Sequence, residues 1–289
     1  MELGLLRLLR PSELVLTAYF LYVAGASLLL PVRTSIATTI LPLNAAVIAA
    51  FLAATWADSL RRGRFLSIVR DWYPTTLALL AYREMGWLAL PHADTRLENA
   101  WVVWDRWLLY DLGLKSVIES LGPLMPSLLE LSYSLVYAVA PFSLAALYVC
   151  GRRRRVDAFL FSFLLGVVSA YVLFPFFPSE PPRTVFAGQD LPSMVTPFRR
   201  FNLGLLGGYG IHTSVFPSAH VSGSMTAALA MLRLLPEKRW IGRGLTILAI
   251  LIATATVYGR YHYLVDVLAG LGLCGMAETA GRLIYRKRA

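Results

Sequence analysis

Long apolar windows recur along the whole chain, and they constrain its fold more than any other feature. Crossing the hydrocarbon core of a bilayer, about 30 Å thick, takes about 20 mainly apolar residues in a helix. Hydrophobic residues make up 57% of the 289 positions and charged residues only 15%. The sequence therefore predicts an all-α, polytopic membrane protein with about eight transmembrane helices. The expected spans are Glu13–Pro31, Ile36–Ala57, Trp72–Leu90, Met125–Val149, Val156–Phe177, Ser218–Leu235, Gly244–Tyr258 and His262–Tyr285.

The distribution of positive charge predicts the orientation of these spans. Eight alternating spans place 17 Lys and Arg residues on one side and 7 on the other. An excess of Lys and Arg in short loops marks the cytoplasmic face. We therefore expect both termini in the cytoplasm, with the protein in a bacterial inner or plasma membrane. The run Arg152–Arg155 is interpreted as a topology anchor that also touches anionic lipid, and no nucleic-acid partner is expected despite the net charge of +10.

The longest break between spans covers residues 91–124 and holds "TRLENAWVVWDRWLLYDLG". Its apolar and aromatic positions alternate with charge at helical spacing, which is typical of a helix lying in the membrane interface. This segment either covers a site from the extracytoplasmic side or only anchors the chain. The pair Asp105 and Arg106 within it is expected to be a solvated surface pair.

Three polar clusters fall on the side opposite the cationic loops. They are "FPSEPPR" ending at Arg183, "FPSAH" ending at His220, and "YGRYHYLVD" from Tyr258 to Asp266. The clusters are far apart in the sequence. If the helices that carry them pack side by side, the three clusters converge on one site at the extracytoplasmic face.

The residue types in these clusters suit a phosphate. Ser218 follows Pro217 at a predicted helix start, where a serine caps free N–H groups and the helix dipole attracts an anion. His262 and Asp266 are four residues apart, so on a helix the carboxylate can accept from one ring nitrogen and leave the other free. Arg183 and Arg260 add guanidinium groups, which contact phosphate in a bidentate way.

Together these residues favour phosphoryl transfer through a phosphohistidine. His262 would attack the phosphorus and His220 would protonate the departing oxygen, while Arg183, Arg260 and Ser218 would stabilise the phosphoryl oxygens. No metal and no cofactor are expected. Taken singly, His220 is as well explained as a helix-cap histidine and the His262–Asp266 pair as a tie between helices. His212, beside several glycines, is a third candidate for a catalytic or zinc-binding residue, although the spacing fits no common zinc pattern.

The motifs resemble those of the type 2 phosphatidic acid phosphatase superfamily, in "FPSEPPR", in "PSAH" from Pro217 and in "RYHYLVD" from Arg260. The chain departs from the common pattern at Phe176, where a Lys is usual, and at Thr256, where an Arg is usual. The motifs "PPR" and "YGRYHYLVDVLAG" are more similar to the inositolphosphotransferase-like branch. The resemblance implies a six-helix catalytic core at residues 66–289, preceded by two extra transmembrane helices at residues 1–65.

Two classes of function stay open from the sequence. An enzyme would pass a phosphoryl or phospho-headgroup from a lipid to water, as a phosphatase, or to an alcohol, as a phosphotransferase. A transporter or anion-binding membrane protein would use the same charged cluster, but its ionisable groups are expected near the middle of the membrane. The motifs lie near one face, which favours the enzyme. The lipid, the acceptor and the oligomeric state are not determined by the sequence.

Overall fold

The computed structural model describes residues 8–61, 63–89, 94–211 and 214–286, and within these residues it contains helices, turns and loops but no strands. This confirms the all-α prediction. The longer helices are α2 (Pro11–Leu29), α3 (Thr34–Arg61), α4 (Arg64–Leu88), α7 (Leu124–Ser134), α8 (Val136–Val149), α9 (Val156–Leu173), α12 (Ala219–Leu234), α13 (Arg239–Tyr258) and α14 (Leu264–Tyr285).

Five helical segments of the described chain are long and apolar enough to cross a membrane: α2, residues 34–60 of α3, 153–176 around α9, 236–258 around α13, and α14. The pair α7 and α8 counts as a sixth span if it is taken as one, although the two helices meet at an angle of 64°. Helices occupy all eight predicted positions, but the count of eight spans is not confirmed. Two of the predicted spans are not long and apolar enough to count as membrane-crossing helices. They are α12, which has 16 residues, and α4, which carries Arg70, Asp71, Arg83 and Glu84.

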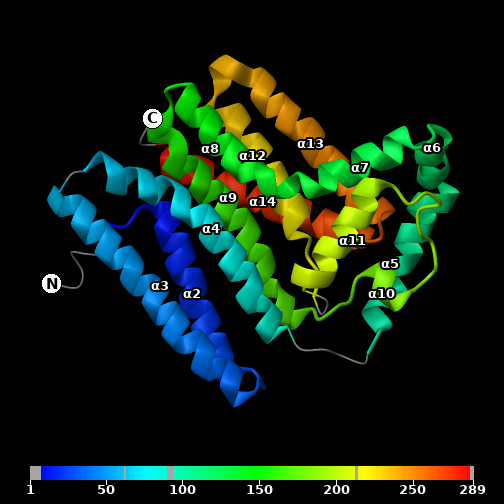
Figure 1. Ribbon diagram of the computed structural model, residues 1–289, viewed down its shortest axis with the longest axis horizontal. Helices are drawn as coiled ribbons and strands as arrows, with labels where there is room; N and C mark the ends of the chain where they lie inside the picture. The colour runs from blue at the N-terminus through cyan, green and yellow to red at the C-terminus, as the bar shows by residue number, and fades with distance from the viewer. Residues whose placement is uncertain (1–7, 62, 90–93, 212–213, 287–289) are drawn as a thin grey trace.

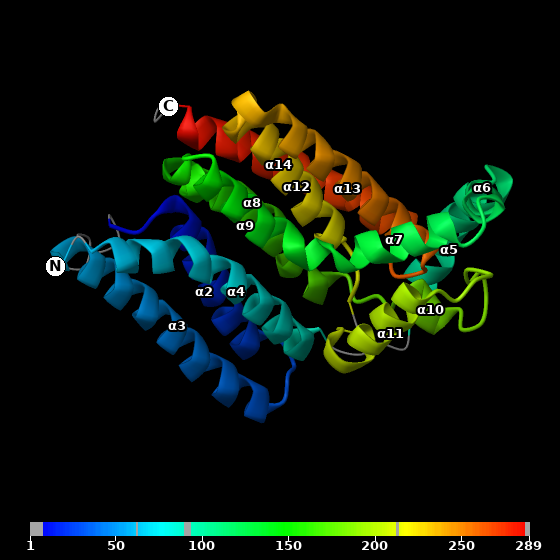
Figure 2. The same cartoon turned by 45° about the horizontal axis from the view of Figure 1, so that its top comes forward.

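The centre of the molecule is α9. It packs against α12 and α14 on one side and against α2 and α4 on the other (Figures 1 and 2). Its sequence is almost entirely apolar, and Phe159, Leu160 and Leu164 are fully buried. Because lipid tails are as apolar as these side chains, close van der Waals packing holds such a bundle together more than the removal of apolar surface from water.

The two N-terminal helices form an outer layer on this core. Of these two helices, α2 packs closely on α9, whereas α3 packs mainly on α2 and α4. The apolar window of α3 is 17% buried, against 61% for the window around α9. The division of the chain into residues 1–65 and 66–289 stays a prediction, and in the structure its boundary falls within the first turn of α4, which begins at Arg64.

Short helices and loops gather at one end of the bundle, while the α8–α9 turn, the α12–α13 turn and the end of α14 lie at the other (Figures 1 and 2). The segment before α7 forms helices as expected, with a π-helical turn between α5 and α6. An ion pair from Arg106 and a hydrogen bond from the hydroxyl of Tyr110, both to Asp190, link it to the loop after α10. The elements at this end are α5 (Arg96–Arg106), the π-helix Trp107–Asp111, α6 (Leu114–Ser120), α10 (Pro182–Val185) and α11 (Pro197–Tyr209).

Candidate active site

The structure brings the two motif histidines together. His220 lies in the first turn of α12, and His262 lies in the turn between α13 and α14. Their ring centroids are 5.6 Å apart and the ring planes are inclined by 60°. Both rings line the same cavity. Two imidazoles at this separation can contact a single tetrahedral group from two sides.

The carboxylate of Asp266 holds one nitrogen of His262. Nδ1 of His262 lies 3.1 Å from Oδ2 of Asp266, and the same oxygen accepts the backbone N–H of Tyr263 at 2.9 Å. When Nδ1 donates its proton to the carboxylate, the lone pair of the ring is on Nε2. The predicted spacing of four residues therefore produces the expected contact, although His262 itself lies just before α14 begins.

The N-terminus of α12 is fixed against α14 by backbone contacts. The N–H of Ser218 donates to the carbonyl of Asp266 at 3.1 Å. A Cβ atom on Gly270 would lie only 2.7 Å from the carbonyl oxygen of Ser218, so the close approach needs a glycine there. The Ser218 hydroxyl caps the helix by accepting from Val221 at 3.4 Å. Ser218 is fully buried and is not among the residues that line the cavity, so its predicted contact with phosphate stays a prediction.

Arg183 is the predicted phosphate ligand that lines the cavity. Its guanidinium lies over the ring of Tyr261, 5.4 Å from the centroid. Within the described part of the chain its side chain makes neither a hydrogen bond nor an ion pair with a carboxylate. Burial lowers the pKa of this guanidinium, but an arginine remains charged near neutral pH. A cation held in a cavity without a counter-charge is suited to bind an anionic ligand.

Arg260, the second predicted phosphate ligand, lies outside the histidine cavity and pairs with a carboxylate. It is fully buried, is not among the residues that line the cavity, and pairs with Asp105 of α5, Nη1 to Oδ2, at 2.5 Å. The other oxygen of Asp105 accepts the N–H of Leu264 at 2.7 Å, at the start of α14. The expectation that Asp105 is solvated is therefore wrong, because it is fully buried between α5 and the turn that carries His262. The phosphate-binding role of Arg260 stays a prediction, without support from its position.

A buried polar network that the sequence did not predict packs against His220. The ring of Tyr133 stacks on His220 at 5.1 Å and on Tyr261 at 4.1 Å. The Tyr261 hydroxyl donates to Glu130 at 2.6 Å, and Arg199 pairs with the same carboxylate at 2.8 Å. These residues come from α7, α11 and the turn after α13. The sequence offers one signal, the charged residues Glu130 and Arg199 in or beside apolar helices, which seldom occur there without a partner.

The cavity extends from the histidines into the bundle. Its volume is about 260 Å³, and apolar and aromatic side chains of α4, α8 and α9 line it together with Arg183 and the two histidines. Examples are Leu79 and Val167. A cavity that is charged at one place and apolar elsewhere is suited to an amphiphile with an anionic group.

His262 lies between two spanning helices and is shielded from water. Burial, followed by the nearby Arg183, lowers its pKa to about 3, while a hydrogen bond to the backbone of Val215 acts in the opposite direction. The ring is therefore neutral near pH 7 and is able to act as a nucleophile.

His212, the candidate for a third catalytic or zinc-binding residue, lies outside the described part of the chain. In the described residues no group of three or more His, Cys, Asp or Glu side chains gathers as metal ligands would. Arg83 and Glu84 of α4 are not among the residues that line the cavity, and Glu84 is fully buried in the described structure.

Comparisons with known proteins identify the family of the chain. Over 56 residues the chain is 48% identical to a PA-phosphatase related-family protein of Dictyostelium discoideum, which is 19% of this chain and 10% of that protein. The chain thus spans about a tenth of the length of this curated relative. No solved structure gives a significant match. The model of the PAP2 superfamily matches residues 99–280, well over half of the chain and all of the elements that carry the histidines, Asp266 and Arg183, so the protein belongs to the PAP2 superfamily.

Proposed function

We propose that the protein is a membrane-embedded phosphatase or phosphotransferase that acts on a lipid phosphate through a phosphohistidine at His262. Family membership points to a phosphatase-type enzyme. The observation that carries the mechanism is the pair of rings 5.6 Å apart, with Asp266 at Nδ1 of His262 and Arg183 in the same cavity.

In the first step Nε2 of His262 attacks the phosphorus in line with the bond to the leaving oxygen. The new N–P bond forms as that P–O bond breaks, and His220 gives its proton to the leaving oxygen. A bound phosphate favours the protonated form of His220 because opposite charges stabilise each other. Arg183 and the N-terminus of α12 stabilise the negative charge on the phosphoryl oxygens.

In the second step an oxygen nucleophile attacks the same phosphorus. The N–P bond breaks, and neutral His220 takes the proton of the attacking hydroxyl, which restores both histidines. Water as acceptor gives a phosphatase, and an alcohol gives a phosphotransferase. The similarity of "YGRYHYLVDVLAG" to the inositolphosphotransferase-like branch supports testing an alcohol acceptor. The apolar walls of the cavity support a lipid as the donor.

The test is the His262→Ala variant compared with wild type on a panel of lipid phosphates and phosphodiesters, with and without free inositol or diacylglycerol. We expect wild type to form an acid-labile phosphoenzyme and the variant to lose both turnover and phosphoenzyme. Mass spectrometry of the products separates hydrolysis from transfer. Turnover in His262→Ala would exclude His262 as the nucleophile, and persistent substrate flux in that variant would favour the transporter.

A further inference from the structure

A second cavity lies at the end of the bundle opposite the histidines. It has a volume of about 1180 Å³, is open to the surface, and is formed where α2, α4, α9, α12 and α14 meet the α8–α9 turn. Among the residues that the structure describes, eight arginines and two acidic residues, Asp71 and Asp157, line it. The argument below concerns this arginine pocket.

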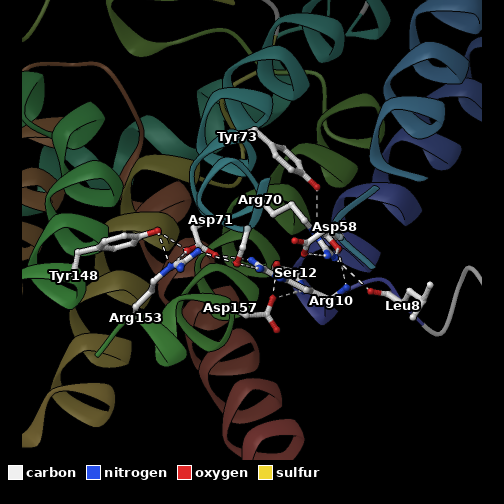
Figure 3. Close-up of polar contacts among 12 residues, drawn as sticks. Leu8, Arg10, Ser12, Asp58, Arg70, Asp71, Tyr73, Tyr148, Arg153 and Asp157 are labelled. Atoms are coloured by element: carbon white, nitrogen blue, oxygen red, sulfur yellow. Dashed lines mark hydrogen bonds and ion pairs between the residues drawn. The ribbon is translucent and has the colours of Figure 1, made fainter. Parts of the chain in front are cut away.

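The acidic residues in and around the arginine pocket are too few for its cations. Asp71 serves two arginines at once, Arg10 at 2.6 Å and Arg153 at 2.7 Å, and also accepts from the hydroxyl of Tyr148 (Figure 3). The oxygens of Asp157 accept from the hydroxyls of Ser12 and Tyr285, and no arginine of the described ranges forms an ion pair with this carboxylate.

The remaining arginines show the same shortage of negative charge. Glu237 pairs with Arg152 and, at 3.9 Å, with Arg155. Glu278 pairs with Arg233 and Arg282. Three carboxylates thus form ion pairs with six arginines. Arg154 and Arg286 line the pocket too, and within the described residues they have neither an ion pair nor a hydrogen bond from the side chain.

Like charges held this close repel each other, and burial increases the repulsion because it weakens solvent screening. The exposed fractions are 21% for the Arg10 side chain and 32% for the Arg153 side chain. The remaining surplus lies on Arg154 and Arg286, which are both exposed, so an anion from outside the chain can reach and neutralise them. Guanidinium groups bind phosphate oxygens in a bidentate way, so a phosphate is the anion that a group of arginines fits best.

The surroundings of the arginine pocket indicate that this phosphate belongs to a lipid. Large apolar side chains close in the sequence to the lining arginines are exposed, with Val149 87% exposed and Leu283 64% exposed. Both residues belong to helices at positions predicted to cross the membrane. A ligand that satisfies the arginines and this surface together needs an anionic head and apolar chains. The excess of positive charge predicts that this end faces the cytoplasm, where anionic lipids collect.

We propose that the arginine pocket binds the phosphate of an anionic phospholipid head group. This site is separate from the histidine cavity and binds the lipid without reacting with it. The bound lipid joins the α8–α9 turn to α2, α12 and α14. It therefore stabilises the fold and does not serve as the substrate.

The test uses Arg154→Gln/Arg286→Gln, which removes the two arginines without ion pairs and leaves every observed ion pair intact. The matched control is Arg239→Gln/Arg243→Gln, which removes the same charge from exposed positions of α13 at the same end of the molecule, outside the pocket. Purified protein in detergent is titrated with short-chain phosphatidylglycerol, with short-chain phosphatidylcholine and with inorganic phosphate, and the thermal midpoint is recorded.

We expect phosphatidylglycerol to raise the midpoint of wild type and of the control. For Arg154→Gln/Arg286→Gln we expect apparent binding about tenfold to thirtyfold weaker, from the usual contribution of a basic side chain near an anionic surface. Binding at the histidine cavity is common to both double variants and cancels in the comparison. Equal weakening in the two doubles would overturn the proposal, as would an equal shift with phosphatidylcholine. A full shift with inorganic phosphate alone would overturn the lipid as the ligand.

Discussion

The catalytic potential of a single histidine depends on what surrounds it. His262 is buried, has Asp266 on Nδ1, and lies near a cation, Arg183. Burial and the cation both disfavour the imidazolium form, whereas an exposed histidine would be half protonated near pH 6.5. The local environment thus keeps the nucleophilic form available over a wide range of pH.

This environment predicts how His262 titrates. With its pKa lowered to about 3, the folded ring stays neutral at pH 5, while an unfolded histidine is protonated there. The unfolded state then binds more protons, so the free energy of unfolding decreases as the pH falls below about 6.5. In protein labelled with ¹⁵N-histidine, the signal that disappears in His262→Ala should keep the shifts of a neutral imidazole down to pH 5. A midpoint near 6.5 for that signal would contradict the assigned environment.

Asp105 is predicted to be a positioning residue for His262. It binds Arg260 with one oxygen and the start of α14 with the other, on the two flanks of the histidine. Asp105→Asn leaves buried Arg260 with only the more distant carboxylate of Asp190, at 3.7 Å, as a counter-charge, so we expect the stability to fall by about 3 kcal/mol at most. The altered turn should lower kcat much more than it raises KM.

Two further variants separate this role from a general loss of charge. Asp111→Asn makes the same change at an exposed position of the same segment and should leave kcat and the thermal midpoint unchanged. Asp105→Asn/Arg260→Met also removes the buried cation that has lost its nearer counter-charge, and should recover part of the lost stability. Full kcat in Asp105→Asn would show that Asp105 does not position His262.

At the scale of helices, the site exists because α12 and α14 approach each other closely. The contact at Gly270 sets where His220 lies relative to His262, since Ser218 and His220 belong to the same helix start. Neither helix shows this from its own sequence. A glycine in a helix is expected to reduce stability unless a neighbour needs the space.

The prediction for this contact compares two glycines on one helix. Gly270→Ala should separate the two histidines and lower kcat at least tenfold, because its Cβ would lie 2.7 Å from the carbonyl oxygen of Ser218. Gly272→Ala is the control, since nothing lies within 4 Å of its Cβ position. It should preserve activity and leave stability equal or slightly higher. Activity and thermal midpoint of both variants check this, and full activity in Gly270→Ala would contradict it.

At the scale of the whole molecule, the histidine cavity and the arginine pocket lie at opposite ends of α9. The charge distribution predicts that the arginine end faces the cytoplasm, which puts the histidines near the extracytoplasmic face. This orientation determines which leaflet supplies the substrate. It also determines which side releases the product.

Single cysteines test the orientation, in a variant that lacks Cys150 and Cys274. Leu121→Cys lies at the histidine end and Trp240→Cys at the arginine end, and these side chains are 55% and 68% exposed. A membrane-impermeant maleimide should label Leu121→Cys in intact cells and Trp240→Cys only after lysis. The reverse pattern would place the histidines in the cytoplasm.

The sequence by itself determined the all-α membrane fold, the positions of the long helices and the identity of the polar motifs. It could do so because hydrophobic length and motif spacing are local properties of the chain. It also predicted the contact between His262 and Asp266, which depends only on a spacing of four residues.

Only the tertiary structure decided the partners of buried charges. Arg260 looked like a phosphate ligand beside His262, yet it pairs with Asp105, which is 155 residues away in the sequence. Glu130, Arg199 and Tyr261 likewise meet from three separate elements. A charge inside a low-dielectric bundle must find a counter-charge wherever packing places one, and no local pattern encodes that choice.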